Sequence, residues 1–182
     1  MGSPISGTIA EIFLQHLEPI YIRPLIETKR ILFYTRYIDD ILIIYDTKTT
    51  NHNYLTQYTN TMHTNLQFNP TPTNGYINFL DLTIIRRSTH IEIDIYQKPT
   101  TTDTAIHFKS IHPNEHKFAA YRYYIERMLN LPLKTVQQKR EWSTILHMAQ
   151  QNGFPPTVIH KLRHQIEHKT KHTTPHNSKN KK

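Results

Sequence analysis

Tyr37-Ile38-Asp39-Asp40 joins two apolar, β-prone runs, Ile31-Leu32-Phe33-Tyr34 before it and Ile41-Leu42-Ile43-Ile44-Tyr45 after it. Runs that are apolar on both faces are typical of strands buried on both sides. Asp tolerates turn dihedrals, so two such strands with an Asp pair between them predict a tight hairpin.

This turn would hold two carboxylates side by side, and their mutual repulsion is relieved when a cation neutralises them. Mg²⁺ suits such a place because it prefers a few carboxylates together with water and substrate phosphates. Two ions about 3.5–4 Å apart are the usual device for in-line phosphoryl displacement. Asp pairs also occur in hairpin turns for conformational reasons, and the dipeptide alone leaves both interpretations open.

The composition limits the class of protein. The chain has 182 residues, enough for one domain with a substantial core, and it has no cysteine, which excludes disulfides and thiolate metal sites. The longest apolar run, residues 41–45, is far shorter than a membrane-spanning helix requires. The N-terminus lacks the pattern of a signal peptide. We therefore expect an intracellular protein, nuclear or cytoplasmic, without a membrane partner.

Charge is distributed unevenly along the chain. Residues 1–108 hold 8 Lys and Arg against 10 Asp and Glu, whereas residues 109–182 hold 14 against 4. The basic part is where a polyanion such as nucleic acid would bind, although surface lysines often serve solubility alone.

Periodicity predicts the elements of the first part. A helix capped by Ser6 carries Ile9, Ile12, Phe13 and Leu17 on one face and ends at Pro19. A second helical pattern covers residues 53–66, and a loop of Pro, Asn and Gly follows at residues 69–75. Two strands are predicted at residues 79–85 and 91–96, with a turn at residues 88–90.

The second part is helical and basic. One helix begins at Pro113 and ends before Leu131-Pro132, and a second covers residues 135–151 and is closed by Gly153. Pro155-Pro156 opens a third helix. The residues after about 169 contain no apolar side chain, so we predict a disordered tail over residues 171–182.

Five motifs stand in an order that resembles the second half of a reverse transcriptase palm followed by its thumb. They are most similar to the reverse transcriptases of Penelope-like retroelements. The resemblance covers nearly all of residues 1 to about 168. The residues that carry it are Gly2-Ser3-Pro4-Ile5-Ser6-Gly7 with Ala10-Glu11-Ile12 and Gln15-His16-Leu17-Glu18, Tyr37-Ile38-Asp39-Asp40, Phe79-Leu80-Asp81-Leu82, Tyr96-Gln97-Lys98-Pro99-Thr100-Thr101-Thr102-Asp103, and His112-Pro113 with His116-Lys117.

The resemblance implies an α+β fold. Residues 1–108 would form a partial polymerase palm of antiparallel strands, with the Asp-Asp hairpin, packing helices and a primer-grip-like hairpin, and residues 109–170 a helical thumb. The implied activity is RNA-directed DNA synthesis by two-metal nucleotidyl transfer, with Asp39 and Asp40 as catalytic and metal-binding residues. Mg²⁺ or Mn²⁺ would be the cofactor of the full-length enzyme, and an RNA template and DNA primer its partners.

The chain departs from this family in two respects. Gln97 stands where the family usually has Arg. In reverse transcriptases a further metal-binding Asp and the fingers lie upstream of the Gly-Ser-Pro loop, where this chain starts, so we expect weak Mg²⁺ or Mn²⁺ binding without turnover. The missing half would belong to a longer chain. No endonuclease segment of the GIY-YIG type, which some of these elements carry, follows the thumb.

The resemblance also implies contacts with nucleic acid. Gly2, Ser3, Pro4 and Tyr37 would lie near the template and the incoming nucleotide. Contacts with backbone phosphates are expected from a second set of side chains, which an ordinary surface hairpin and helix would equally explain: Lys98, Thr100, Thr101, His112, His116, Lys117, Arg122 and Arg127.

Three alternatives remain open. His112 and His116 are four residues apart, a spacing that suits zinc, but no third protein ligand is evident in the sequence. The basic helices also resemble a helix-turn-helix, so the chain could be a non-enzymatic nucleic-acid-binding protein that needs no cofactor. A degenerate relic that folds poorly is the third possibility, because half a palm leaves buried strands without neighbours.

Overall fold

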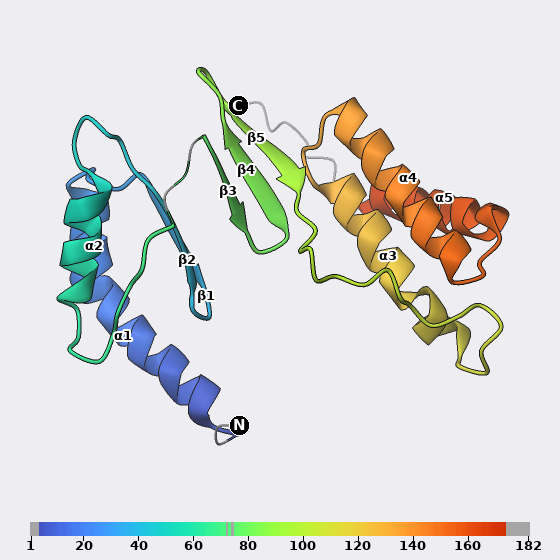
Figure 1. Cartoon of the computed structure of the whole chain (residues 1–182), viewed down its shortest axis with the longest axis horizontal. Helices are drawn as coiled ribbons and strands as arrows, with labels where there is room; N and C mark the ends of the chain where they lie inside the picture. The colour runs from blue at the N-terminus through green and yellow to red at the C-terminus, as the bar shows by residue number, and fades with distance from the viewer. Residues whose placement is uncertain (1–3, 72, 74, 174–182) are drawn as a thin grey trace, which may run out of the picture. The chain divides into compact units, whose positions relative to one another are not determined.

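The computed structural model describes residues 4–71, residue 73 and residues 75–173 (Figure 1). These residues form five helices and two small antiparallel sheets, which confirms the predicted α+β class. The chain divides into two compact units, Met1–Asn74 and Gly75–Lys182. No helix among the described residues is both long and apolar enough to cross a membrane.

The first unit consists of α1 (Ser6–Glu27), the hairpin β1 (Phe33–Tyr37) and β2 (Asp40–Ile44), and α2 (His52–Asn60). The prediction that the first helix ends at Pro19 is wrong, because α1 continues through Pro19 and Pro24. Beyond Pro19, Ile22 and Leu25 are each only 3% exposed in the core of this unit. Their burial offsets the backbone hydrogen bonds that the two prolines cannot make.

The expected apolar face of α1 is also wrong in its first half. Ile9 is 57% exposed and Ile12 is 62% exposed, whereas Leu17 is buried. The core of the first unit draws on α1 only from Leu17 onward, where α2 and the hairpin contribute Leu55, Tyr34 and Ile43. Helical periodicity therefore identified apolar positions correctly but did not reveal which of them have a neighbour to pack against.

Helix α2 is shorter than the predicted residues 53–66. It starts at an Asn51 cap, whose side-chain oxygen accepts a hydrogen bond from the Tyr54 amide at 2.9 Å. The helix ends at Asn60, whose side-chain oxygen accepts a hydrogen bond from the Phe68 amide at 2.6 Å. The segment after α2 thus folds back on it, and Met62 is buried without being helical.

The second unit begins with a three-stranded meander, β3 (Tyr76–Phe79), β4 (Leu82–Arg86) and β5 (Ile91–Ile95), in the order β3-β4-β5. The predicted strand at residues 79–85 is confirmed for residues 82–85, which belong to β4, but is wrong at its start, because Phe79 pairs with Leu82 across a turn at Leu80 and Asp81. Leu80 has a φ of 54°, a left-handed conformation that cannot be predicted from an apolar side chain.

The helices of the second unit follow the prediction closely. They are α3 (Asn114–Asn130), α4 (Thr135–Gln151) and α5 (Pro156–Thr173). Their shared core is centred on Tyr121, Ile125, Ile145 and Ile159, each at most 1% exposed. The predicted disordered tail is wrong at its start, because residues 171–173 belong to α5, and its remainder lies outside the described residues.

Asn152 attaches the preceding loop to this bundle. Its side-chain oxygen accepts a hydrogen bond from the Ala105 amide at 2.9 Å, and its Nδ2 donates to the Asp103 carbonyl at 2.8 Å. Gly153 follows with a φ of 78°, and a Cβ there would lie 2.5 Å from the His107 ring. Both features fix the course of the chain between the sheet and α3.

Candidate metal site at the Asp-Asp hairpin

The predicted hairpin is present, but the prediction that its turn holds both aspartates is wrong, because Asp40 is paired in the strand. Tyr37 pairs with Asp40, so Ile38 and Asp39 form a two-residue turn and Asp40 is the first residue of β2. The expectation that both strands are buried on both faces is wrong, because Phe33 is 48% exposed. Tyr34 and Ile43 on one face of the hairpin pack against the core of the first unit. The other face is mixed, because it carries the exposed Phe33 together with Leu42, which is only 8% exposed.

Ile38 gives this turn an unusual backbone. Its φ is 56°, a conformation that is a genuine outlier for a β-branched residue. Such conformations persist only where the surroundings enforce them, and they cluster at functional sites. One enforcing contact is visible: Arg36 Nη1 donates to the Ile38 carbonyl at 3.1 Å.

Arg36 is the centre of a polar cluster between the hairpin and α1. Its side chain is only 6% exposed. It donates through Nη1 and Nη2 to the Glu11 carboxylate at 2.8 and 3.0 Å, and through Nε to Glu18 at 2.6 Å. Tyr34 completes the cluster by donating its hydroxyl to Glu18 at 2.9 Å. The guanidinium therefore joins two turns of α1 to the hairpin.

The pKa values in this cluster follow from its contacts. Hydrogen bonds from Arg36 lower the pKa of the Glu11 carboxyl below its ordinary value. The hydrogen bonds to Glu11 and Glu18 outweigh the burial of Arg36 and raise its pKa further. Burial and the neighbouring Glu18 raise the pKa of Tyr34. Arg36 thus carries a permanent charge that two carboxylates of α1 balance.

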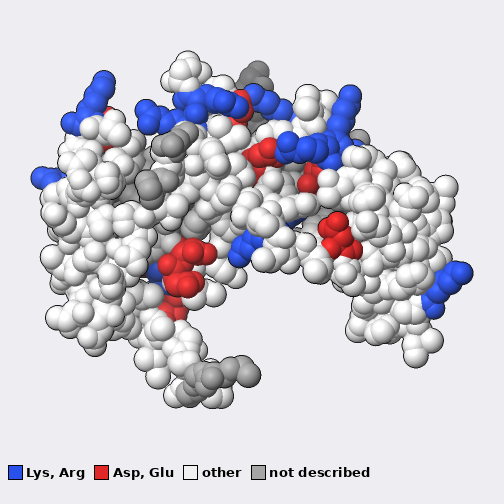
Figure 2. Space-filling model, in the orientation of Figure 1, with Lys and Arg blue, Asp and Glu red and all other residues white. Residues whose placement is uncertain are grey.

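Asp39 and Asp40 differ from these carboxylates because both are exposed. Among the described residues, no side chain or backbone donor pairs with either carboxylate. In the space-filling view, acidic atoms gather at this end of the first unit (Figure 2). Two adjacent oxygen ligands without a cationic partner are a donor set that suits Mg²⁺ or Mn²⁺.

The other residues predicted near this site are placed unequally. Tyr37 lies next to the turn and is 57% exposed. Pro4 is exposed just before α1, whereas Gly2 and Ser3 lie outside the described residues. No group of three or more His, Cys, Asp or Glu side chains gathers within metal-binding reach in residues 4–71, 73 and 75–169.

Part of the predicted nucleic-acid set lies on the surface of the second unit. Lys98, Thr100 and Thr101 are exposed in the segment after β5, where the Thr101 amide donates to the Lys98 carbonyl at 2.8 Å. His112 and His116 are exposed as well, and Ser110 contacts His112 Nδ1 at 3.0 Å. These side chains remain accessible to a ligand.

Other members of that set take part in internal contacts. Lys117 Nζ donates to the carbonyls of Phe108 and Ser110 at 3.2 and 3.3 Å. Arg122 Nη1 lies 3.4 Å from the Glu115 carbonyl. Both cations support the start of α3, so their charges are less available than the sequence suggests.

Among the predicted nucleic-acid-binding residues, Arg127 pairs with two carboxylates of the second unit. Its side chain is 11% exposed and donates to Asp81 at 3.3 Å and to Glu141 at 2.9 Å. Burial opposes its charge, but the contacts with Glu141 raise the pKa of Arg127 above its ordinary value. Sequence reasoning missed these partners, which are 46 and 14 residues away along the chain.

Part of this set also meets at one cavity of the second unit. The cavity has a volume of about 240 Å³, and its lining combines three tyrosine rings with the predicted Lys98, Thr101 and Arg127. The remaining lining residues are Asp81, Gln97 and Met148. In the sequence these residues belong to the segment after β5 and to α3, and the fold brings them together.

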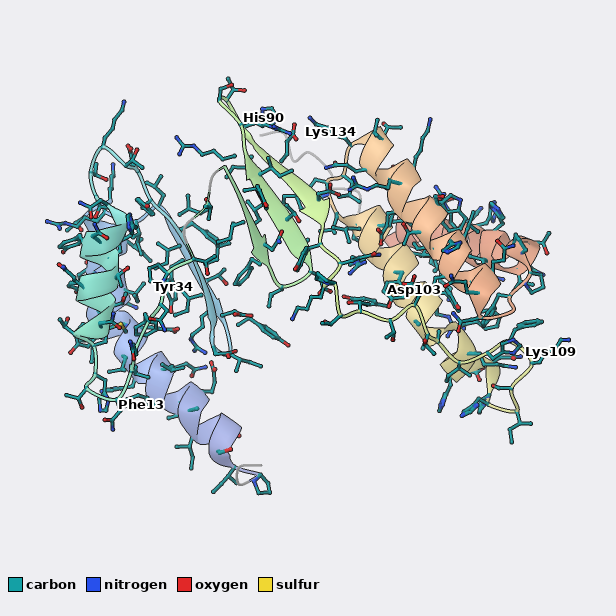
Figure 3. The ribbon with its side chains drawn as sticks, viewed as in Figure 1. Phe13, Tyr34, His90, Asp103, Lys109 and Lys134 are labelled. Carbon is teal, nitrogen blue, oxygen red and sulfur yellow. The ribbon has the colours of Figure 1, made fainter. Side chains whose placement is uncertain are left out.

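Cations and carboxylates also alternate at the end of the sheet where β4 turns into β5. Glu92 binds Arg87, His90 and Lys134, and Asp94 binds Arg140. Figure 3 shows Lys134 beside His90, and Figure 2 shows Lys and Arg atoms around this end of the sheet. The hydrogen bonds from Lys134 and Arg87 lower the pKa of Glu92 to about 2.

Comparisons of the chain with protein-family models, with curated proteins and with solved structures gave no match.

Proposed function

We propose that this chain is part of a reverse transcriptase of the Penelope-like type and that Asp39 and Asp40 bind a divalent cation. The observation that carries the proposal is the state of the two carboxylates, which are adjacent, exposed and without a cationic partner among the described residues. The motif order described above supplies the family, and the strained turn at Ile38 adds support from the backbone.

The donor set fits the cation that such enzymes use. Asp39, in the turn, is the stronger ligand candidate, and Asp40, which opens β2, supports it. In the family, the bound ions activate the attacking oxygen and stabilise the charge that develops during nucleotidyl transfer. The resemblance implies a further Asp outside these residues, so the proposal for this chain by itself is cation binding rather than turnover.

A Mn²⁺ titration followed by electron paramagnetic resonance tests this proposal. We expect the wild-type chain to bind Mn²⁺ and both Asp39→Asn and Asp40→Asn to lose that binding. Asp103→Asn is the matched control, because Asp103 is an exposed aspartate of the second unit (Figure 3). Equal Mn²⁺ binding by all four proteins would contradict the proposal.

Nucleic-acid binding by the second unit is the other candidate function. Residues 109–182 hold 14 Lys and Arg against 4 Asp and Glu. Lys109, Lys139 and Lys161 are exposed, and none forms an ion pair within residues 4–71, 73 and 75–169. Unpaired cations of this kind can neutralise backbone phosphates without reading sequence.

A gel-shift series between about 50 and 200 mM salt separates the two candidates, because phosphate contacts weaken steeply over that range. We expect Lys109→Ala, Lys139→Ala and Lys161→Ala to weaken RNA binding together and to flatten its salt dependence. Lys29→Ala with Lys48→Ala, exposed cations of the first unit, serves as the charge control. Asp39→Ala with Asp40→Ala leaves affinity unchanged if the chain only binds, whereas an active polymerase that contains these residues loses primer extension.

A further inference from the structure

Arg36 is connected to both sides of the candidate cation site. On one side it is held by Glu11 and Glu18 of α1, and on the other it donates to the Ile38 carbonyl. That carbonyl belongs to the peptide group that joins Ile38 to Asp39. Fixing the plane of this peptide group fixes the direction in which the Asp39 backbone leaves the turn.

We propose that Arg36 is the positioning residue of the Asp39 and Asp40 cation site and that α1 acts through it to keep the turn in its binding conformation. This inference rests on the proposed function. Arg36 does not touch the cation in this arrangement. It orients the ligands in the way that hydrogen-bond partners of metal ligands do at other metal sites.

The geometry of the contacts explains why the side chain is arginine. A guanidinium offers five donors in one plane, and Arg36 uses them for three acceptors in different directions, Glu11, Glu18 and the Ile38 carbonyl. A lysine carries the same charge but offers a single nitrogen, which cannot reach all three at once. The contact with its carbonyl adds a side-chain hydrogen bond to the hairpin pairing that places Ile38 at a φ of 56°.

A positioning role and a purely electrostatic role predict opposite results. If charge alone mattered, a cation near the site would oppose the binding of another cation. Replacing Arg36 with an uncharged residue would then strengthen Mn²⁺ binding, since Glu11 and Glu18 would also be left unpaired. Replacing it with lysine would change nothing. If Arg36 positions the turn, both substitutions weaken Mn²⁺ binding.

The experiment is the Mn²⁺ titration on the full chain with Arg36→Lys, compared with Arg23→Lys as the matched control on the exposed face of α1. We expect Arg36→Lys to weaken Mn²⁺ binding roughly tenfold, the lower end of what the loss of such a supporting contact costs. We also expect faster hydrogen exchange at the Asp39 amide. Arg23→Lys should match the wild type in both measurements.

Two outcomes would overturn the inference, and they differ in what they say of the proposed function. If Asp39→Asn abolishes Mn²⁺ binding while Arg36→Lys retains the wild-type affinity, the cation site stands and the positioning role fails. If Asp39→Asn has no effect, both fail. Circular dichroism checks that each variant is folded.

A second variant keeps the inference testable if Arg36→Lys does not fold. Glu11→Gln removes the bidentate partner of Arg36 but leaves Arg36 in place. Glu27→Gln, at the exposed end of α1, removes the same charge without touching the cluster. We expect Glu11→Gln, without added Mn²⁺, to speed hydrogen exchange at the Asp39 amide more than Glu27→Gln does, and equal exchange would overturn the positioning role.

Discussion

Two hairpin turns in this chain share one backbone design and differ in how their aspartate is used. In each, an aromatic residue is followed by an aliphatic residue at positive φ, Ile38 at 56° and Leu80 at 54°, and then by an aspartate. Asp81 accepts hydrogen bonds from the Tyr123 hydroxyl at 2.6 Å and from Arg127 at 3.3 Å. Asp39 has no such partner among the described residues.

Other paired carboxylates in the two units show what Asp39 and Asp40 lack. In the second unit, the carboxylates of Asp81, Glu92, Asp94 and Glu141 all pair with cations of the same unit. In the first unit, Glu11 and Glu18 are paired through Arg36, whereas the Asp pair is left over. Adjacent unpaired carboxylates repel each other, and a bound cation of the kind proposed above would relieve that repulsion.

The largest expected effect is on the paired side of the comparison. Arg127→Met leaves the carboxylate of Glu141, which is 9% exposed, without its partner. Breaking a buried pair from one side costs about 3–5 kcal/mol of unfolding free energy. The fluorescence of Trp142, the only tryptophan of the chain, reports guanidinium unfolding of the second unit selectively. Arg122→Met on the same helix is the control and should cost far less.

The next effect depends on pH. The pKa of Glu92 is about 2, below the usual 4.5, so its ion pairs stabilise the fold above pH 4.5 and lose that contribution as pH falls toward 2. Glu92→Gln should therefore lower the urea midpoint, followed by Trp142 fluorescence, near neutral pH. The difference in urea midpoint between Glu92→Gln and the wild type should disappear as the pH is lowered. Glu126→Gln, on an exposed position of α3, should show no gap at any pH.

The two aspartates can be compared directly by the same substitution. Asp81→Asn weakens two charge-assisted contacts of a half-exposed side chain, and we expect it to cost about 1 kcal/mol. Asp39→Asn removes no contact of the described chain and should stay within about 0.5 kcal/mol of the wild type. Thermal melts followed by circular dichroism measure both. A comparable loss for Asp39→Asn would mean that its carboxylate has a structural partner after all.

The hairpin at the Asp pair could be predicted from local sequence. The two β-prone runs and the Asp pair between them lie within fifteen consecutive residues, and the hairpin they predict is present. The turn at Leu80 was not predictable in the same way, because leucine is not a turn residue and the positive φ there is imposed by the surrounding sheet. Strand periodicity therefore extended β4 back to Phe79 and missed the rest of β3.

Tertiary contacts account for the other differences. The rule that proline ends a helix is local. The continuation of α1 to Glu27 depends instead on the burial of Ile22 and Leu25 in a core that cannot be predicted from the local sequence. The same holds for Arg127, whose partner Asp81 lies 46 residues earlier. Sequence analysis places an arginine such as Arg127 on the surface by default, and only the fold reveals that carboxylates already pair with it.

The smallest expected effect concerns the feature that the two turns share. A left-handed conformation costs a non-glycine residue roughly 1–2 kcal/mol, and glycine removes that cost but loses about 0.5–1 kcal/mol more in conformational entropy on folding. Ile38 is 66% exposed, so Ile38→Gly gives up little burial and should raise the stability of the first unit by about 0.5 kcal/mol.

Leu80→Gly is the matched substitution in the other turn, and there the half-buried side chain also loses packing. We expect Leu80→Gly to lower the stability of the second unit, so the two glycine variants should differ in sign. Thermal melts by circular dichroism measure the first variant and Trp142 fluorescence the second. If Ile38→Gly instead destabilises the first unit, Ile38 makes an apolar contact there that outweighs its strain, and the turn is held by packing as well as by Arg36.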